Sequence, residues 1–336
     1  MKIAIDISPL ARQKRTGIEN YIFNLCKNLP EIDKENEYIL FANSYGHYQI
    51  LRQVIEEINI KKYQNTSAKI SKVPSSVLRL MWKYMYFPSA DHLIGEKIDV
   101  FHVSDRLNPP LKKAKLIATI FDLSPIKFKE FFTEKSVRYF VYYFKSIIPK
   151  ADMIIAISNC TKNDILEYFD IAEERVQVIP LATNDNYKQI LDKQTINGIK
   201  EEYGINGNYI LFVGTLEPRK NIVNLIKAYS ALPDDIKHDC SLVICGKKGW
   251  YYEEIFRTVK KLKLEEHGHI TKLLNNVYLY NLLDVNIILI GPFKSTQSIQ
   301  LRANRLIFKY KFFIPKSLVF DENIKDNKRN RLSNSD

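Results

Sequence analysis

Short, unbroken apolar runs alternate with helix-like segments along most of the chain, and this alternation limits the fold more than any other feature. The runs are continuous rather than alternating, as in parallel strands that are covered on both faces. Between them, residues 18–29 and 222–229 have apolar side chains at helical spacing, and Pro30 is predicted to stop the first of these helices. Strands that alternate with helices predict open parallel sheets of the doubly wound α/β class. The expected strands are residues 2–6, 38–42, 100–103, 116–121, 153–157, 176–179, 209–214, 241–246 and 285–290.

The chain has 336 residues, a length that suits two domains. A polar stretch with Gly198, Gly204 and Gly207 follows the sixth expected strand, and it is predicted to contain one helix over residues 196–203. We therefore expect a first Rossmann-like domain over residues 1–183, a linker over 184–208 and a second Rossmann-like domain over 209–293. Residues 294–336 form a basic tail. Two such domains would meet in a cleft lined by the carboxyl ends of both sheets.

The formal charge of +12 indicates an anionic partner, and nucleic acid, anionic lipid and a phosphorylated small molecule fit it equally well. No zinc-ligand spacing, helix-turn-helix or aromatic RNA-binding signature accompanies the basic residues, so nucleic acid is not an expected partner. The four cysteines and six histidines form no metal-like cluster. Scattered cysteines are typical of buried free thiols in a reducing cytosol, which predicts a cytoplasmic protein.

No run of about 18 uncharged apolar residues occurs, and the first ten residues include Lys2 and Asp6, which favours a strand over a signal peptide. Residues 76–87 and 138–150 are both aromatic and basic. They are interpreted either as helices packed in the first domain with their cations reaching solvent, or as a peripheral contact with the inner face of a membrane.

The segment most informative about chemistry is residues 209–222. A buried strand ends at Gly214, a turn follows, and a helix is predicted to begin at Asn221, a favourable N-cap residue. Arg219 and Lys220 would then lie where unpaired backbone N–H groups and the helix dipole favour an anion. The pair suits a diphosphate, although a solvated loop with two surface cations fits the same pattern.

Several segments, taken in order, resemble the family 4 (group 1) glycosyltransferases. The turn Gly-Thr-Leu-Glu-Pro-Arg-Lys-Asn at residues 214–221 is similar to the donor-binding entry of that family, and Thr-Gly-Ile-Glu-Asn-Tyr at 16–21 is similar to its glycine-containing first loop and helix. Segments 100–103, 118–125, 151–159, 178–180 and 243–251 agree as well, so the resemblance covers about residues 1–264. It implies the two-domain GT-B fold and retaining transfer of a sugar, without a metal or other cofactor, from a nucleotide-sugar donor to a saccharide or lipid-linked acceptor.

The resemblance also implies roles for individual residues. Arg219 and Lys220 would neutralise the diphosphate as the leaving group departs. Gly17 would let the backbone approach the donor phosphate or the transferred sugar, or it would simply start a helix. Asp122, the expected catalytic residue, would hydrogen-bond sugar hydroxyls, and a capping role is an equal alternative. The remaining residues expected at the nucleotide-sugar cleft are Gly214, Thr215, Glu217 and Gly246.

Two departures from the family pattern bear on activity. Phe121 stands where the family usually has a histidine, and phenylalanine offers no hydrogen bond to sugar or phosphate. After Asp284 no two glutamates are eight residues apart, whereas the family holds the donor's hydroxyls with such a pair. The second domain is therefore expected to be incomplete and donor binding weak. The alternative to an active hexosyltransferase, including a mannosyltransferase, is an inactive glycosyltransferase-like binding protein.

Overall fold

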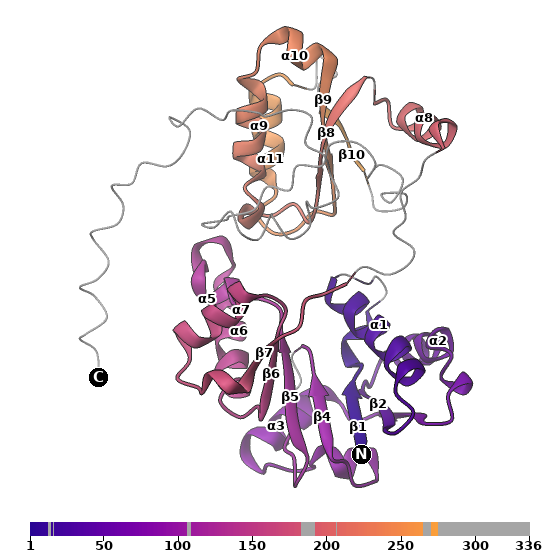
Figure 1. Cartoon of the computed structure of the whole chain (residues 1–336). Helices are drawn as coiled ribbons and strands as arrows, with labels where there is room; N and C mark the ends of the chain where they lie inside the picture. Colours follow the sequence, from indigo (N-terminus) through magenta and orange to yellow (C-terminus); the bar gives the residue numbers. More distant parts are fainter. Residues whose placement is uncertain are drawn as a thin grey trace, which may run out of the picture. The chain divides into compact units, whose positions relative to one another are not determined.

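The computed structural model describes residues 1–12, 15, 17–105, 109–182, 192–205, 207–264 and 270–274 (Figure 1). The strands are β1 (Lys2–Asp6), β2 (Glu37–Asn43), β3 (Thr66–Ser71), β4 (Val100–Val103), β5 (Lys115–Ile120), β6 (Met153–Ala156), β7 (Val176–Val178), β8 (Asn208–Val213), β9 (Cys240–Cys245) and β10 (Ile270–Leu274). The α-helices are α1 (Gly17–Ile32), α2 (Tyr48–Ile58), α3 (Ser75–Tyr84), α4 (Ala90–Ile94), α5 (Ser124–Lys127), α6 (Glu134–Ile147), α7 (Asn159–Tyr168), α8 (Lys193–Glu202), α9 (Ile222–Ser230), α10 (Asp234–Asp239) and α11 (Glu253–Lys261). Short 3-10 turns are η1 (Ser8–Ala11), η2 (Ile60–Lys62), η3 (Lys129–Phe131), η4 (Glu173–Arg175) and η5 (Pro218–Lys220).

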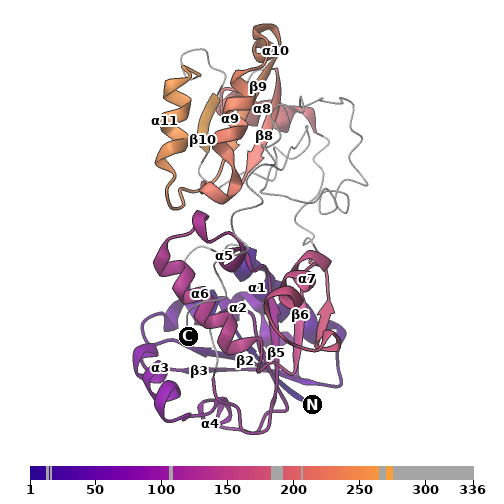
Figure 2. The ribbon, with the colours of Figure 1, turned by 90° about the vertical axis from the view of Figure 1, so that its left-hand side faces the viewer.

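The first lobe contains a seven-stranded parallel sheet in the order β3-β2-β1-β4-β5-β6-β7. Helices α6 and α7 cover one face, and α1 and α2 cover the other (Figures 1 and 2). Neighbouring residues of one strand therefore enter different cores: in β2, Ile39 and Phe41 belong to one buried cluster, and Tyr38, Leu40 and Ala42 belong to the other. Because successive strand side chains point to opposite faces, an unbroken apolar run is required here.

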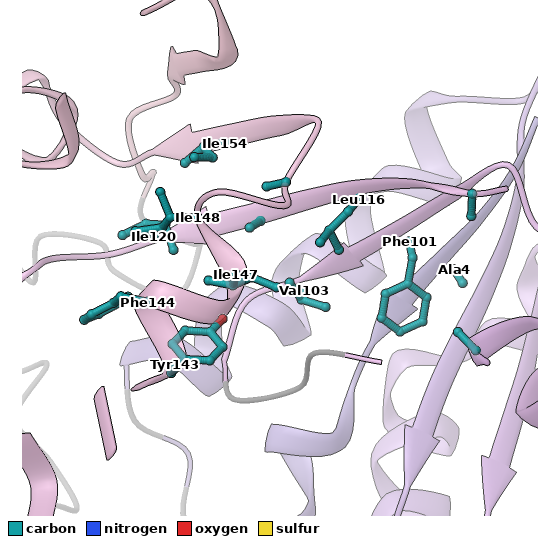
Figure 3. Packing of buried hydrophobic residues seen from close by; sticks show 14 of the residues in the cluster. Ala4, Phe101, Val103, Leu116, Ile120, Tyr143, Phe144, Ile147, Ile148 and Ile154 are labelled. Atoms are coloured by element: carbon teal, nitrogen blue, oxygen red, sulfur yellow. The ribbon is translucent and has the colours of Figure 1, made fainter. Parts of the chain in front are cut away.

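The larger of these cores joins the sheet to α6. Figure 3 shows Phe101 and Val103 of β4, Leu116 of β5, and Phe144 and Ile147 of that helix, which belong to one buried cluster. All five side chains are at most 5% exposed. This packing fixes the strand ends from which the site loops leave.

The second lobe has a parallel sheet in the order β10-β9-β8 within the described residues. Its strands also divide their side chains between two cores, with Phe212 packed among the residues of α9 and α11, and Leu211 packed with Ile199 of α8. The doubly wound α/β prediction is confirmed for both lobes, and so is the predicted helix over 196–203, which is α8.

Other expectations differ from the structure. Helix α1 runs through Pro30 to Ile32, so the predicted stop is wrong by two residues. Strand β3 was not predicted, because this edge strand alternates exposed and half-buried residues instead of forming an apolar run. Strand β10 was also missed, since Lys272 interrupts a short segment. The predicted strand 285–290 lies outside the described residues, as do the tail 294–336 and most of the region in which the second domain is expected to be incomplete.

No helix within the described part of the chain is long and apolar enough to cross a bilayer. All four cysteines are free, but only Cys26 and Cys245 are buried, and Cys160 is exposed. The expectation that all four thiols are buried is therefore wrong at Cys160.

Candidate functional site

The strand order of the first sheet reverses between β1 and β4, which are neighbours although β2 and β3 separate them in the chain. In open α/β sheets a crevice forms at such a switch point, outside the carboxyl ends of the strands. Here the loops after β1, β2 and β4 open into a cavity of about 1150 Å³ within the first lobe. These loops contribute polar side chains to its lining, and α3, the turn after it and α6 contribute aromatic ones.

The polar lining centres on Arg12, which follows β1. Its guanidinium forms an ion pair with Glu19 of α1, a fully buried carboxylate, and its Nη2 lies 3.4 Å from Oδ2 of Asp105, which follows β4. Asn43 and Ser44 at the end of β2 line the same cavity. Sugar hydroxyls bind to such mixed donors and acceptors, so this end of the cavity suits a polar, hydroxyl-bearing molecule.

Asp6 is the last residue of β1, two positions before Ser8, which lines the cavity. Its Oδ1 accepts a hydrogen bond from the backbone N–H of Ser8 at 2.9 Å, and its Oδ2 is buried without a hydrogen-bond partner among the described residues. Burial raises the pKa of Asp6 to about 7, although the bonds from Ser8 oppose the shift. The carboxyl group is thus poised to gain or lose a proton near neutral pH.

The aromatic lining includes Trp82 and Tyr86 from α3 and the turn after it, and Tyr139 and Tyr142 from α6. The indole Nε1–H of Trp82 donates to the carbonyl of Pro88 at 2.9 Å, which fixes the ring. Aromatic faces stack on the apolar faces of sugar rings and on hydrocarbon chains alike. Sequence reasoning missed this cavity, although polar residues directly after three parallel strands were a usable signal.

Asp122 is exposed and follows β5, at the same edge of the sheet. Its Oδ1 accepts the N–H of Ser124, the first residue of α5, at 2.9 Å in an Asx turn, while the N-cap position of α5 is Leu123. Phe121 packs edge-on against Tyr21 at 5.3 Å between ring centres. His102 does not take the place of the missing histidine: its Nε2 lies 2.8 Å from the Thr119 hydroxyl, and burial lowers the pKa of His102 to about 4.

Gly17 is the first residue of α1. A Cβ added there would meet no atom of the described chain within 4 Å, and its backbone φ is not in the left-handed region. Neither packing nor backbone conformation therefore requires glycine, although glycine costs a helix about 1 kcal/mol relative to alanine. The prediction that Gly17 serves a ligand stays a prediction.

In the second lobe, the loops after β8 and β9 run side by side. The N–H of Gly214 donates to the carbonyl of Cys245, and the N–H of Leu216 donates to the carbonyl of Lys247, both at 2.9 Å. A Cβ on Gly246 would lie 1.7 Å from the Gly214 carbonyl oxygen. Gly246 is thus required by the chain itself, independently of any nucleotide.

The predicted anion site follows these loops. Glu217 is 4% exposed, and its Oε1 accepts from Nη2 of Arg219 at 2.7 Å and from Nε at 3.0 Å. This pair orients the guanidinium and leaves three of its five N–H groups not engaged by Glu217. Burial, followed by the positive charge of Arg219, lowers the pKa of Lys220, while the carboxylate of Glu217 opposes that effect. A cation whose charge is disfavoured in this way gains from a bound anion.

Asn221 occupies the N-cap position of α9, as predicted, but its side chain makes no capping hydrogen bond. Its backbone has φ 55° and ψ 31°, which is left-handed, because the 3-10 turn η5 (Pro218–Lys220) ends there before α9 begins. The expected role of the Asn221 side chain is therefore wrong, and its tolerance of a positive φ explains the residue instead. Arg219 and Lys220 lie in η5, just before the first turn of α9.

The structure thus brings Gly214, Thr215, Glu217, Arg219, Lys220 and Gly246 together at the carboxyl ends of β8 and β9. Gly17 and Asp122 belong to the first lobe. Among the described residues, no group of three or more His, Cys, Asp or Glu side chains is placed to hold a metal ion.

Two family models match the chain, one after the other. Residues 15–187 match the model described as Glycosyltransferase Family 4, and residues 196–292 match the model described as Glycosyl transferases group 1. The first contains Gly17 and Asp122, and the second contains the turn with Arg219 and Lys220.

Curated relatives include two bacterial mannosyltransferases. The chain is 24% identical to O-antigen chain mannosyltransferase B of Escherichia coli over 263 residues, which are 78% of this chain and 68% of that protein. It is 33% identical to serotype-specific mannosyltransferase WbdA of E. coli over 135 residues, or 40% of this chain and 17% of the relative. The chain thus spans about two thirds of the first relative and a sixth of the second.

Solved structures with the same fold include Anabaena HepE in complex with UDP and glucose, with a TM-score of 0.55 and 16% identity over 84% of this chain and 71% of that one. WaaG, a glycosyltransferase involved in lipopolysaccharide biosynthesis, gives a TM-score of 0.58 and 12% identity over 86% and 75% of the two chains. These likenesses establish the GT-B fold.

Proposed function

The chain belongs to glycosyltransferase family 4, and on that premise we propose that it transfers a hexose, with mannose as the first candidate, from a nucleotide sugar to a saccharide or lipid-linked acceptor. Transfer proceeds with retention of the anomeric configuration. The observation that carries this proposal is the Arg219–Lys220 pair, held before α9 by the buried carboxylate of Glu217. The curated relatives that are mannosyltransferases support the choice of sugar.

Arg219 and Lys220 bind the donor diphosphate and offset the charge that develops as the nucleoside diphosphate leaves. A guanidinium oriented by Glu217 needs no reorganisation in the transition state, and the partly buried ammonium of Lys220 gains most when an anion arrives. These two cations supply the charge that a metal supplies in other transferases, so we propose transfer without a metal. Activity undiminished by a chelator would support this, and dependence on an added divalent cation would contradict it.

The acceptor binds in the cavity of the first lobe. Its polar end, at Arg12, Asn43 and Asp105, hydrogen-bonds sugar hydroxyls, and the rings of Trp82 and Tyr86 stack against the remainder of the acceptor. Asp122 keeps its expected role at the sugar as a proposal, with Oδ1 accepting the N–H of Ser124. An acceptor on a lipid would place the protein at the inner face of a membrane as a peripheral, cytoplasmic protein. For the donor, the HepE structure in complex with UDP and glucose is a precedent for a nucleotide bound in this fold.

Titration calorimetry with UDP- and GDP-sugars tests the donor site, and NMR of the product's anomeric proton tests retention. Lys220→Met is the decisive variant, because it removes one charge and leaves the Glu217–Arg219 pair intact. We expect it to weaken donor binding at least tenfold. Arg219→Ala is less suitable, since an unpaired buried carboxylate at Glu217 would destabilise the lobe by about 3 kcal/mol or more.

The absence of the glutamate pair from residues 285–336 predicts weak donor affinity. The alternative function, an inactive saccharide-binding protein, is favoured by one observation: the cavity is formed wholly by the first lobe. Saccharide binding to the full chain with no binding of any nucleotide sugar would establish this alternative. Transfer of a sugar by the full chain would exclude it.

A further inference from the structure

Exposed apolar side chains are concentrated on α3 and the turn that follows it. On one side of α3, Leu78 is buried and Trp82, one turn later, is fixed to Pro88. Elsewhere on α3 and in the turn after it, large apolar side chains are exposed to solvent. They are Val77 (45% exposed), Leu80 (61%), Tyr84 (68%), Met85 (64%), Tyr86 (69%) and Phe87 (45%), and we call them the α3 surface.

The spacing shows that this exposure is a property of the helix face. Val77, Leu80 and Tyr84 are three and seven residues apart, so they share one side of α3. A helix of a water-soluble domain normally has polar residues on that side, whereas α3 is apolar on both. The six side chains make a patch of the kind that marks an interaction site.

The segments that carry and adjoin the α3 surface are basic. Residues 71–90 contain three Lys or Arg and no Asp or Glu, and residues 135–150 contain four Lys or Arg and no Asp or Glu. The Nζ of Lys150, three residues after the end of α6, lies 5.9 Å from the centre of the Tyr86 ring, which places this cation beside the apolar segment. Lys72 and Lys145 are exposed as well. Apolar and aromatic side chains next to cations match the interface of an anionic bilayer.

We propose that the α3 surface binds the interfacial region of an anionic lipid bilayer, with Val77, Leu80 and Met85 inserted among the acyl chains. Leu78, Trp82 and Tyr86 line the cavity of the first lobe from the same segment, so membrane binding brings the cavity opening to the lipid surface. A lipid-linked saccharide then enters the cavity without leaving the bilayer. This proposal deepens the peripheral localisation proposed above, and membrane binding itself requires no catalytic activity.

Vesicle co-sedimentation with the full chain tests the proposal, using vesicles of phosphatidylglycerol with phosphatidylethanolamine against pure phosphatidylcholine. The triple variant Val77→Ser, Leu80→Ser and Met85→Ser changes three side chains that do not line the cavity. We expect the natural chain to bind the anionic vesicles at least tenfold more tightly than the neutral ones, and the triple variant to lose at least tenfold. The matched control, Ile32→Ser, replaces a 78% exposed apolar side chain outside the surface and should bind as the natural chain does.

The triple variant also distinguishes the α3 surface from the basic tail and from a dimer contact. Residues 294–336 contain ten Lys and Arg against four Asp and Glu, so this tail can attract anionic vesicles by itself. If the triple variant, which keeps the tail, sediments like the natural chain, the α3 surface is not the membrane contact. A concentration-dependent dimer that the triple variant abolishes, without vesicle binding, would assign the surface to a second copy and overturn the proposal. Transfer to a soluble acceptor is measured in parallel, and its absence would contradict the proposed function while leaving the vesicle result readable.

Discussion

Replacing Gly17 with alanine separates a ligand role from a structural one. The added methyl group would meet nothing of the described chain within 4 Å, and the residue opens a 16-residue helix. Alanine therefore removes unfolded-state freedom and improves helix propensity, which predicts a free energy of unfolding that is unchanged or raised by up to about 1 kcal/mol. For a lobe of this size, that corresponds to a melting temperature up to about 4 °C higher.

The same change is expected to reduce catalysis. If the donor's phosphate or sugar lies against the backbone of Gly17, a methyl group displaces it, and a tenfold loss in kcat/KM corresponds to about 1.4 kcal/mol at the transition state. The assay pairs thermal unfolding with steady-state transfer. Unchanged kcat/KM in a stable Gly17→Ala protein would refute the assigned role, and a loss of stability above about 1 kcal/mol would refute the structural reasoning behind it.

The other predictions concern the second lobe and the buried ionisable groups. Gly246→Ala, the same substitution at a position where the Cβ would lie 1.7 Å from the Gly214 carbonyl oxygen, should destabilise the second lobe by about 3 kcal/mol or more, as measured by denaturant unfolding. Donor affinity, measured by calorimetry, should be constant near neutral pH and fall as the pH rises toward the pKa of Lys220, which is lowered from 10.5. Lys220→Arg should flatten this profile, because a guanidinium stays charged over the same range. An unchanged profile in that variant would show that another group titrates. Asp6→Asn should stabilise the protein at pH 9 by up to about 4 kcal/mol, because folding raises the pKa of Asp6 from 3.8 to about 7 and the ionised carboxylate therefore opposes folding at high pH. The gain should disappear at pH 4, where the carboxyl group of the folded protein is protonated. A gain that persists at pH 4 would mean that charge is not the cause.

The sequence was sufficient for the parts of the fold in which local pattern and burial agree. Strands such as β1 and β4 are unbroken apolar runs because both faces of a central strand are covered, and the helices between them show their buried side through spacing. Edge strand β3 was not predicted, because an edge strand with an exposed side has no unbroken apolar run. The left-handed backbone at Asn221 could not be predicted for another reason. Asparagine is favourable both as an N-cap residue that accepts a hydrogen bond and at a position with positive φ, and the sequence does not distinguish the two roles.

The candidate site divides in the same way. Arg219 and Lys220 were predictable because a local segment of strand, turn and helix carries them. The buried partner Glu217 was expected only as a cleft residue, since a side-chain ion pair two positions away depends on how the turn folds. The contacts among Arg12, Glu19 and Asp105 form because β1 and β4 are neighbours in the sheet. Arg12 and Asp105 themselves are 93 residues apart in the chain. No local pattern contains that information.

The two halves of the chain differ in how much charge they can present to a ligand. In the first lobe, Arg12 lies between two buried carboxylates, Glu19 and Asp105, so its charge is already compensated and an anionic group gains little there. In the second lobe, the described residues pair Arg219 with the carboxylate of Glu217, while burial and the charge of Arg219 lower the pKa of Lys220 against the opposing carboxylates of Glu217 and Asp122, so a bound anion stabilises this lysine. A dianionic diphosphate therefore favours the second lobe and a neutral, hydroxyl-rich saccharide favours the first. This electrostatic difference assigns the diphosphate to the second lobe and the saccharide to the first without reference to any relative. Inorganic pyrophosphate should accordingly compete with the nucleotide sugar and leave saccharide binding unchanged, whereas equal competition at both sites would show that the compensation at Arg12 is not effective.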